Sequence, residues 1–127
     1  MDKLQYESIY GYCRVSSDEQ AKHGTSLAEQ QKTITKMSMY LFEREPDGFY
    51  VDDGVSGALD FYKRPDGKKL QNVLEPNDVV LVAKLDRLIR RLSVLCSVRD
   101  AFNELNIHLF AHDILGGAES ISTSKSP

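Results

Sequence analysis

The sequence predicts one α/β domain, a three-layer fold with a mainly parallel sheet of four to five strands. Its 127 residues are enough for a single hydrophobic core. Two apolar runs, 8–15 and 79–83, are nearly continuous, which is typical of strands buried on both faces. Helical patterns separate these runs from two shorter ones, and such alternation favours a parallel sheet.

The first strand, 8–15, is followed by a polar loop and then by a helix that begins at Ser26. Ser26 and Glu29 have the spacing of a capping box, in which each side chain bonds the backbone of the other residue. The helix is expected to end before the turn at 46–48. Its buried face is predicted from apolar residues at helical spacing: Leu27, Ile34, Met37 and Leu41.

A short second strand is predicted at 49–51, and a glycine-punctuated loop at 52–57 contains two solvated aspartates. Residues 58–63 show no clear period, and we expect a mobile segment there. Pro65 suits the first turn of a helix that runs to about Leu74.

The third strand, 79–83, precedes a long helix with an apolar stripe, and a fourth strand is predicted at 107–111. The stripe consists of Leu92, Leu95, Val98, Phe102 and Leu105. Asn106 ends that helix, and the serine-rich tail at 120–127 is expected to be disordered.

Composition excludes several classes of protein. The net charge of −3 argues against a module that binds nucleic acid by charge alone. The sequence contains no apolar stretch of about 18 residues and no signal-peptide pattern, so a cytoplasmic protein without membrane contact is expected. Cys13 and Cys96 are expected to be small buried apolar residues, and the three histidines show no metal-ligand spacing.

Ser16 follows the first strand directly, and Arg14 lies two residues before it. Open α/β sheets place ligands and chemistry at the carboxyl ends of their strands. A guanidinium matches phosphate oxygens, and a serine hydroxyl is a possible nucleophile. The alternative from these residues alone is that Ser16 and Ser17 cap a turn.

A basic segment follows the third strand in the same way. Arg87 and Arg90 are three residues apart, so on a helical turn they share a face, and Arg91 adds a charge. Asp86 can orient a guanidinium or take part in proton transfer. Because a helix N-terminus disfavours cations, these arginines favour a bound phosphate over a solvated basic face.

Arg64 closes the central loop and could bring a further guanidinium to the same place, although an exposed loop arginine is the alternative. Gln20 and Gln30, taken alone, suit surface amides. Converging guanidiniums favour phosphoryl transfer, because they hold the negative charge of the transition state without a metal ion.

Together these segments resemble the catalytic domain of the serine recombinases, the resolvase/invertase family. The resemblance covers about residues 8–115 and rests on four segments in the family's order. They are Tyr12-x-Arg14-Val15-Ser16-Ser17-x-x-Gln20, Ser26-Leu27-Ala28-Glu29-Gln30, Asp53-Gly54-Val55-Ser56-Gly57 with Arg64-Pro65, and Leu85-Asp86-Arg87-Leu88-x-Arg90.

The resemblance implies site-specific recombination of double-stranded DNA, as in resolvases, invertases, integrases and transposases of mobile elements. Ser16 would become linked to a 5′-phosphate, without cofactor, metal or small-molecule substrate. The implied phosphate ligands and DNA contacts are Arg14, Arg64, Arg87, Arg90 and Arg91. Gln20 and Asp86 would position groups or move protons, and Gln30 and Ser56 would support them. Subunits would pair as dimers and act as tetramers.

The resemblance divides the chain into a catalytic domain, 1–119, and the tail 120–127. The family's dimerisation helix and DNA-binding domain are not expected within these residues. A truncated or inactive fragment that only binds partners therefore stays open as an alternative. A flavodoxin-like nucleotide binder is disfavoured, since the first strand is not followed by a glycine-rich loop.

Overall fold

The computed structural model describes residues 6–17, 26–89 and 92–115. These residues form a four-stranded sheet in the order β2-β1-β3-β4, and all three strand pairs are parallel. The strands are β1 (Ile9–Val15), β2 (Gly48–Asp53), β3 (Val79–Val82) and β4 (His108–Ala111). The predicted fold class is therefore confirmed.

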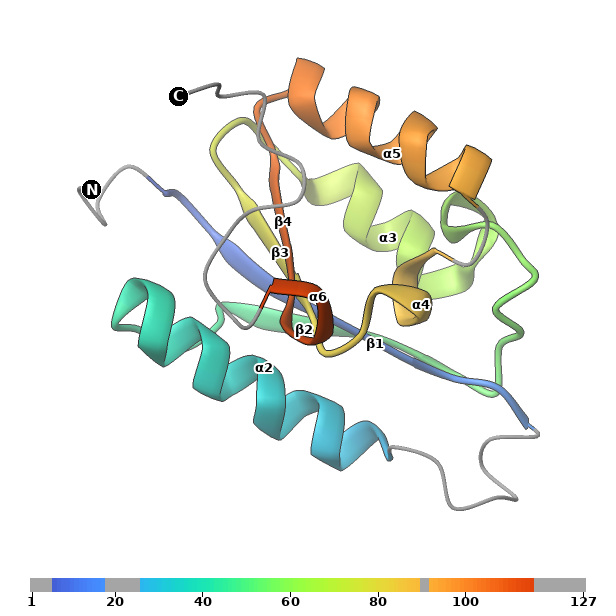
Figure 1. Ribbon diagram of the computed structural model, residues 1–127, viewed down its shortest axis with the longest axis horizontal. Coiled ribbons are helices and arrows are strands. Elements are labelled where there is room, and N and C mark those ends of the chain that lie inside the picture. Colours follow the sequence, from blue (N-terminus) through green and yellow to red (C-terminus); the bar gives the residue numbers. More distant parts are fainter. Residues whose placement is uncertain (1–5, 18–25, 90–91, 116–127) are drawn as a thin grey trace.

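Helices cover both faces of the sheet (Figure 1). On one face lies α2 (Leu27–Phe42), and on the other lie α3 (Pro65–Val73) and α5 (Leu92–Glu104). Two short helices, α4 (Leu85–Leu88) and α6 (His112–Leu115), follow the carboxyl ends of β3 and β4. None of the helices in the described part of the chain is long and apolar enough to cross a membrane.

Local sequence explains the clearest elements. All four residues of β3 are fully buried, as expected for a strand covered on both faces. Ser26 caps α2, and its hydroxyl accepts a hydrogen bond from the Glu29 amide while the Glu29 side chain accepts one from the Ser26 amide. The predicted capping box is therefore present.

The sheet separates two hydrophobic clusters. The cluster beneath α2 includes Ile34 and Met37, and the cluster beneath α3 and α5 includes Leu70, Val98 and Phe102. Burial of these side chains fixes the helices on the sheet.

Two predictions about the ends of elements were wrong, and the segment that showed no clear period contains local structure. Strand β2 extends to Asp53, and Asp52 is buried rather than solvated in a loop. Residues 58–63 contain a short 3₁₀ helix, η2 (Phe61–Lys63), and the Phe61 side chain is fully buried. Leu105 lies beyond α5 and is 54% exposed, since the chain has already turned toward β4.

The long helix predicted after β3 is divided in two. α4 ends at Leu88, and Ile89 has extended backbone angles (φ −138°, ψ 134°) before α5 begins. Cys96 on α5 is exposed, so only Cys13 is the buried thiol that was expected of both. Burial raises the pKa of Cys13 to about 12.

Candidate active site

The candidate site lies where β1 and β3 separate. β1 pairs with β2 along its length to Val15, but its pairing with β3 stops at Gly11. The connections from β1 and from β3 run over opposite faces of the sheet, which makes this gap a topological switch point. The short helix α4 contacts β1 at this place, so the basic segment after β3 meets the end of the first strand.

Arg14 lies at the end of β1 and its side chain is fully buried. Its Nε donates to the Arg87 carbonyl (3.1 Å), and its Nη2 donates to the Asp86 carbonyl (3.3 Å). Its Nη1 donates to the carbonyl of Val55 in the central loop (2.8 Å). The guanidinium therefore joins this loop to α4.

Gln30 holds the backbone of Arg14 from the other side. Its Oε1 accepts from the Arg14 amide (3.2 Å), and its Nε2 donates to the Arg14 carbonyl (3.1 Å). Gln30 is fully buried, so the prediction of a surface amide from its sequence context alone was wrong.

Arg87 approaches the same carbonyl from α4. It is 7% exposed, and its Nη1 donates to the Arg14 carbonyl (3.1 Å). Its Nε donates to the Asp86 carboxylate (3.0 Å), whose side chain is half-exposed. Arg14 and Arg87 thus each bind the backbone of the other residue.

Arg64 is buried rather than an exposed loop arginine, with 1% of its surface accessible. Its Nη1 donates to the Arg87 carbonyl (2.7 Å) and to the Tyr12 hydroxyl (3.1 Å). Three guanidiniums from distant parts of the sequence, Arg14, Arg64 and Arg87, therefore meet around the backbone of α4.

Two further residues of this network were not predicted. The Tyr12 hydroxyl donates to Asp52 Oδ2 (2.7 Å), and the same carboxylate accepts from the amides of Asp66 (2.8 Å) and Gly67 (3.0 Å). Asp52 therefore lies on the N-terminus of α3, where the helix dipole favours an anion. Burial, and the Asp52 carboxylate in addition, raise the pKa of Tyr12 despite the opposing charge of Arg64.

The position of this pair follows from the register of the two strands. Tyr12 is opposite Tyr50 in the β1–β2 register, so Asp52, two residues further, lies on the same face of the sheet. That argument requires the register of the two strands, which the sequence alone does not provide.

The remaining predicted residues are placed as follows. Ser16 is half-buried directly after β1, and Ser17 is exposed. Ser56 is exposed, and its hydroxyl accepts a hydrogen bond from the Ala58 amide, which stabilises the central loop. Gln20, Arg90 and Arg91 lie outside the described residues. The helical turn that carries Arg87 ends at Leu88, since Ile89 has extended backbone angles, and the predicted pairing of Arg87 with Arg90 lies outside the described residues.

Arginines outnumber carboxylates in this network, with Arg14, Arg64 and Arg87 against Asp52 and Asp86. Arg64 forms no ion pair with the described residues, and backbone carbonyls supply most of its acceptors. Carbonyl dipoles neutralise a buried guanidinium only in part, so an anion near this cluster is favoured. Among the described residues, no group of three or more side chains could hold a metal ion.

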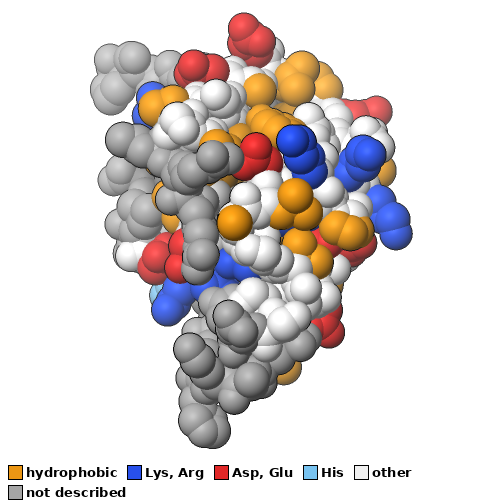
Figure 2. Space-filling model, turned by 90° about the vertical axis from the view of Figure 1, so that its right-hand side faces the viewer, with side chains coloured by type: hydrophobic (Ala, Val, Ile, Leu, Met, Phe, Trp, Pro, Cys, Tyr) orange, Lys and Arg blue, Asp and Glu red, His pale blue; other side chains and the backbone are white. Residues whose placement is uncertain are grey.

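Figure 2 shows the side of the molecule at which β1 ends, to the right in Figure 1. Among the described residues, the basic side chains on this face do not form one continuous patch, and hydrophobic side chains lie between some of them. The guanidiniums of Arg14, Arg64 and Arg87 are themselves largely internal.

Comparison with known proteins identifies close similarity to one family. The family profile described as "Resolvase, N terminal domain" matches residues 9–125. The Transposon Tn917 resolvase of Enterococcus faecalis is 29% identical over 104 residues, and the Transposon Tn2501 resolvase of Escherichia coli is 29% identical over 118. These matches cover 81% and 91% of this chain but 48% and 55% of the relatives. The chain therefore spans about half the length of the curated relatives it matches.

Two solved structures have a similar fold. The N-terminal catalytic domain of TP901-1 integrase aligns with a TM-score of 0.70 and 30% identity, over 93% of this chain and 85% of that chain. A resolvase family site-specific recombinase from Streptococcus pneumoniae aligns with a TM-score of 0.66 and 24% identity, over 93% and 78%. The second likeness supports the fold alone.

Proposed function

Because this chain belongs to the resolvase N-terminal domain family, the catalytic domain of the serine recombinases, we propose that it cleaves and rejoins DNA in site-specific recombination. The observation that carries this proposal is the convergence of Arg14, Arg64 and Arg87 at the end of β1, directly before Ser16. A phosphodiester is an anion that suits such a cluster, and a serine beside it is placed for attack.

In the proposed reaction, the Ser16 oxygen forms a bond to the phosphorus of a DNA phosphodiester, and its hydroxyl proton passes to a carboxylate or to water. The bond from phosphorus to the 3′-oxygen breaks, and the leaving oxygen takes up a proton to become a 3′-hydroxyl. The serine is then joined to the 5′-phosphate. Attack by a 3′-hydroxyl on this phosphoserine reverses the step, so the number of phosphodiester bonds is conserved and no nucleotide cofactor is consumed.

Arg14 and Arg87 are proposed to bind the non-bridging oxygens, where negative charge grows in the transition state. Arg90 and Arg91 follow in the same segment and are proposed to contact the DNA phosphates. Guanidiniums then take the part that metal ions have in other phosphoryl-transfer enzymes.

The other predicted residues have supporting roles in this proposal. Asp86, which binds Arg87 and is half-exposed, is proposed to orient that guanidinium or to move a proton. Gln20 is proposed to position the reacting groups, and Gln30 and Ser56 to hold Arg14 and the central loop. The proposed partners are double-stranded DNA and further copies of the protein, paired as dimers and assembled as tetramers.

A denaturing gel that detects a protein–DNA adduct tests the proposal. The complete reading frame that encodes this chain is incubated with supercoiled DNA carrying its own flanking sequences, with a chelator present. A protease-sensitive adduct is expected for the native sequence and for Ser17→Ala, and none for Ser16→Ala. An adduct that persists in Ser16→Ala would move the nucleophile, and no adduct from the native sequence would favour an inactive fragment that only binds partners.

A further inference from the structure

We infer that Arg64 is a positioning residue, which fixes the central loop on α4 and does not itself contact the scissile phosphate. This inference rests on the proposed function and assigns Arg64 a different task from Arg87. It also differs from the resemblance, which implied that Arg64 contacts the DNA and assists the arginines that bind the scissile phosphate.

The first argument is a count of hydrogen-bond donors. A guanidinium has five N–H groups in a fixed fork. In Arg64 four of them are engaged: Nε with the Leu59 carbonyl (2.7 Å), Nη1 with the Tyr12 hydroxyl (3.1 Å) and the Arg87 carbonyl (2.7 Å), and Nη2 with the Gly57 carbonyl (3.4 Å). One donor is left, which is too few for the bidentate grip that makes arginine a good phosphate ligand.

The second argument is that a buried series of hydrogen bonds holds Arg64 in place. Its Tyr12 partner donates to Asp52, and Asp52 accepts from two amides at the start of α3. The Arg64 residue itself is the N-cap of α3, and its carbonyl accepts from the Lys68 amide (2.8 Å). Movement toward a phosphate would break this buried series of bonds, each of which is costly to leave unmade.

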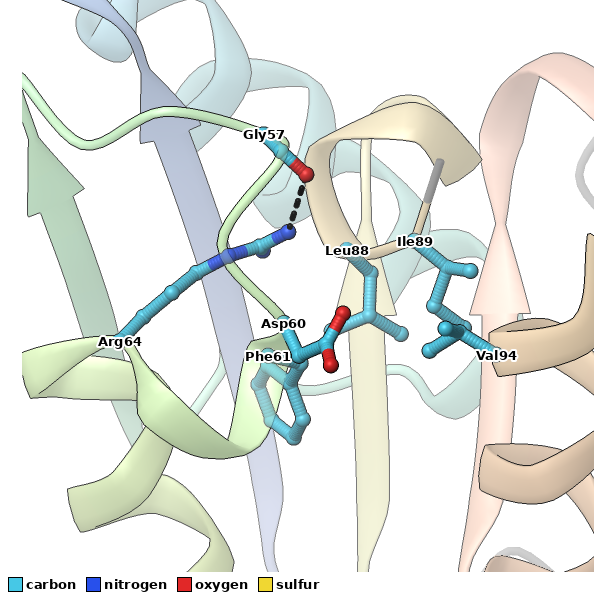
Figure 3. Close-up of a pocket in the computed structure, with 7 residues that line it drawn as sticks. All are labelled: Gly57, Asp60, Phe61, Arg64, Leu88, Ile89 and Val94. Atoms are coloured by element: carbon cyan, nitrogen blue, oxygen red, sulfur yellow. Dashed lines mark hydrogen bonds between the residues drawn. The ribbon is translucent and has the colours of Figure 1, made fainter. Parts of the chain in front are cut away.

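The third argument is the chemistry of the hollow that Arg64 lines, shown in Figure 3. Four of its other six lining residues are apolar, and the only other charged one is an aspartate. The lining residues are Gly57, Asp60, Phe61, Leu88, Ile89 and Val94. Apolar walls and a carboxylate disfavour a phosphate, so this hollow is not a place where Arg64 would meet one.

The bonds of Arg64 explain what it positions. Two of its acceptors, the carbonyls of Gly57 and Leu59, belong to the central loop, and one, the carbonyl of Arg87, belongs to α4. Arg64 therefore fixes the distance between this loop and the turn that carries Arg87. Small displacements of a group that binds the transition state cost about 100-fold in rate, so loss of this clamp should reduce catalysis without removing a DNA contact.

The experiment compares Arg64→Gln, Arg64→Lys and Arg87→Gln in the complete protein. Single-turnover cleavage is measured on supercoiled DNA, and binding to a short duplex is measured across a series of salt concentrations. A phosphate ligand that loses its charge reduces the slope of log Kd against log salt by about 1. Arg99→Lys, an exposed arginine on α5, is the matched control.

For a positioning residue, both Arg64 variants are expected to lose about 100-fold in cleavage rate and to keep the native salt slope. Arg87→Gln is expected to lose cleavage and also to show a slope of log Kd against log salt that is smaller by about 1. Lysine should not rescue Arg64, because one ammonium group cannot reach four separated acceptors. A slope for Arg64→Gln that falls like that of Arg87→Gln, or a cleavage rate for Arg64→Lys near native, would overturn the inference.

A second measurement separates this inference from the proposed function. Amide hydrogen exchange is compared between Arg64→Lys and Arg99→Lys in the absence of DNA. Faster exchange at Leu59 and Ile89 is expected in Arg64→Lys only, since the Leu59 amide bonds Ser56 within the clamped loop and the Ile89 amide bonds Leu85 across the turn that carries Arg87. Absence of an adduct from the native protein would defeat the proposed function, whereas unchanged exchange at both amides would defeat the clamp.

Discussion

Gln30 binds the backbone of Arg14 as a neighbouring strand would, with one hydrogen bond accepted from its amide and one donated to its carbonyl. The pairing of β1 with β3 has already ended at Gly11, so this side chain replaces a strand at the end of β1. A residue from α2 thereby fixes the direction in which the chain enters the candidate site.

Replacement of Gln30 by alanine is expected to lower the free energy of unfolding by about 1–3 kcal/mol, because a buried amide and carbonyl lose a partner. Urea denaturation measures the change. Gln71→Ala, on an exposed turn of α3, makes the same substitution in a helix and is expected to change stability by less than about 0.5 kcal/mol. Equal effects of the two substitutions would mean that the pairing with Arg14 contributes nothing.

The Tyr12 hydroxyl connects Asp52 with Arg64, and Tyr12→Phe removes that oxygen without changing the packing of the ring. A loss of about 1–2 kcal/mol in the free energy of unfolding is expected, since buried polar groups are left with one partner fewer. Tyr10→Phe is the matched control, because Tyr10 packs on Tyr50 and its hydroxyl bonds no other described residue. Urea unfolding of both variants measures the two losses. If Tyr12→Phe and Tyr10→Phe changed the free energy of unfolding equally, the Tyr12 hydroxyl would not be a bridge.

The sequence predicted the elements whose signals are local. Strands β1 and β3 are nearly continuous apolar runs, and the start of α2 depends on two residues three positions apart. The meeting of Arg14 with Arg87 also followed from a general rule, because parallel strands end at the same edge of a sheet.

The break between α4 and α5 could not be predicted in the same way. An apolar spacing through Leu88, Leu92 and Leu95 suits one continuous helix. The chain instead turns at Ile89, and the carbonyls of Asp86 and Arg87 then accept hydrogen bonds from Arg14 and Arg64. Tertiary contacts with buried guanidiniums thus outweigh a local helical pattern, and nothing in the segment itself indicates them.

A buried carboxylate at the opposite end of the sheet makes stability depend on pH. Asp78 is 3% exposed, and its oxygens accept from the amides of Ser8 (3.1 Å) and Glu75 (2.8 Å). Burial raises its pKa, and the negative charges of Glu75 and Glu7 raise it further, against the effect of the two amides. The folded state therefore binds this proton more tightly than the unfolded state does. The stabilisation that protonated Asp78 gives the folded state is complete below the unfolded pKa of about 3.9. It is lost as the pH rises through the pKa of Asp78 in the folded state.

Removal of the two neighbouring charges, in a Glu7→Gln and Glu75→Gln double variant, is expected to lower the pKa of Asp78. Stability at pH 7 should rise by about 0.2–0.5 kcal/mol, because less repulsion acts on the ionised carboxylate. Carbon-detected NMR titration of the Asp78 carboxyl and urea denaturation at pH 4 and pH 7 measure the two effects. Asp100→Asn, exposed on α5, is expected to leave the Asp78 titration unchanged.

Residues 1–127 alone are expected to bind duplex DNA weakly, although the proposed substrate is DNA. The net charge is −3, and the three arginines of the site are between 0% and 7% exposed. Their donors bond mainly to backbone carbonyls, and the described basic side chains on the face shown in Figure 2 do not form one continuous patch. Few phosphates can therefore be neutralised at once, and a Kd of about 10⁻⁴ M or weaker is expected near 0.15 M salt. Fluorescence anisotropy with a labelled duplex measures this affinity, and micromolar binding with a steep salt slope would show that the positive charge of the site is available to DNA without rearrangement.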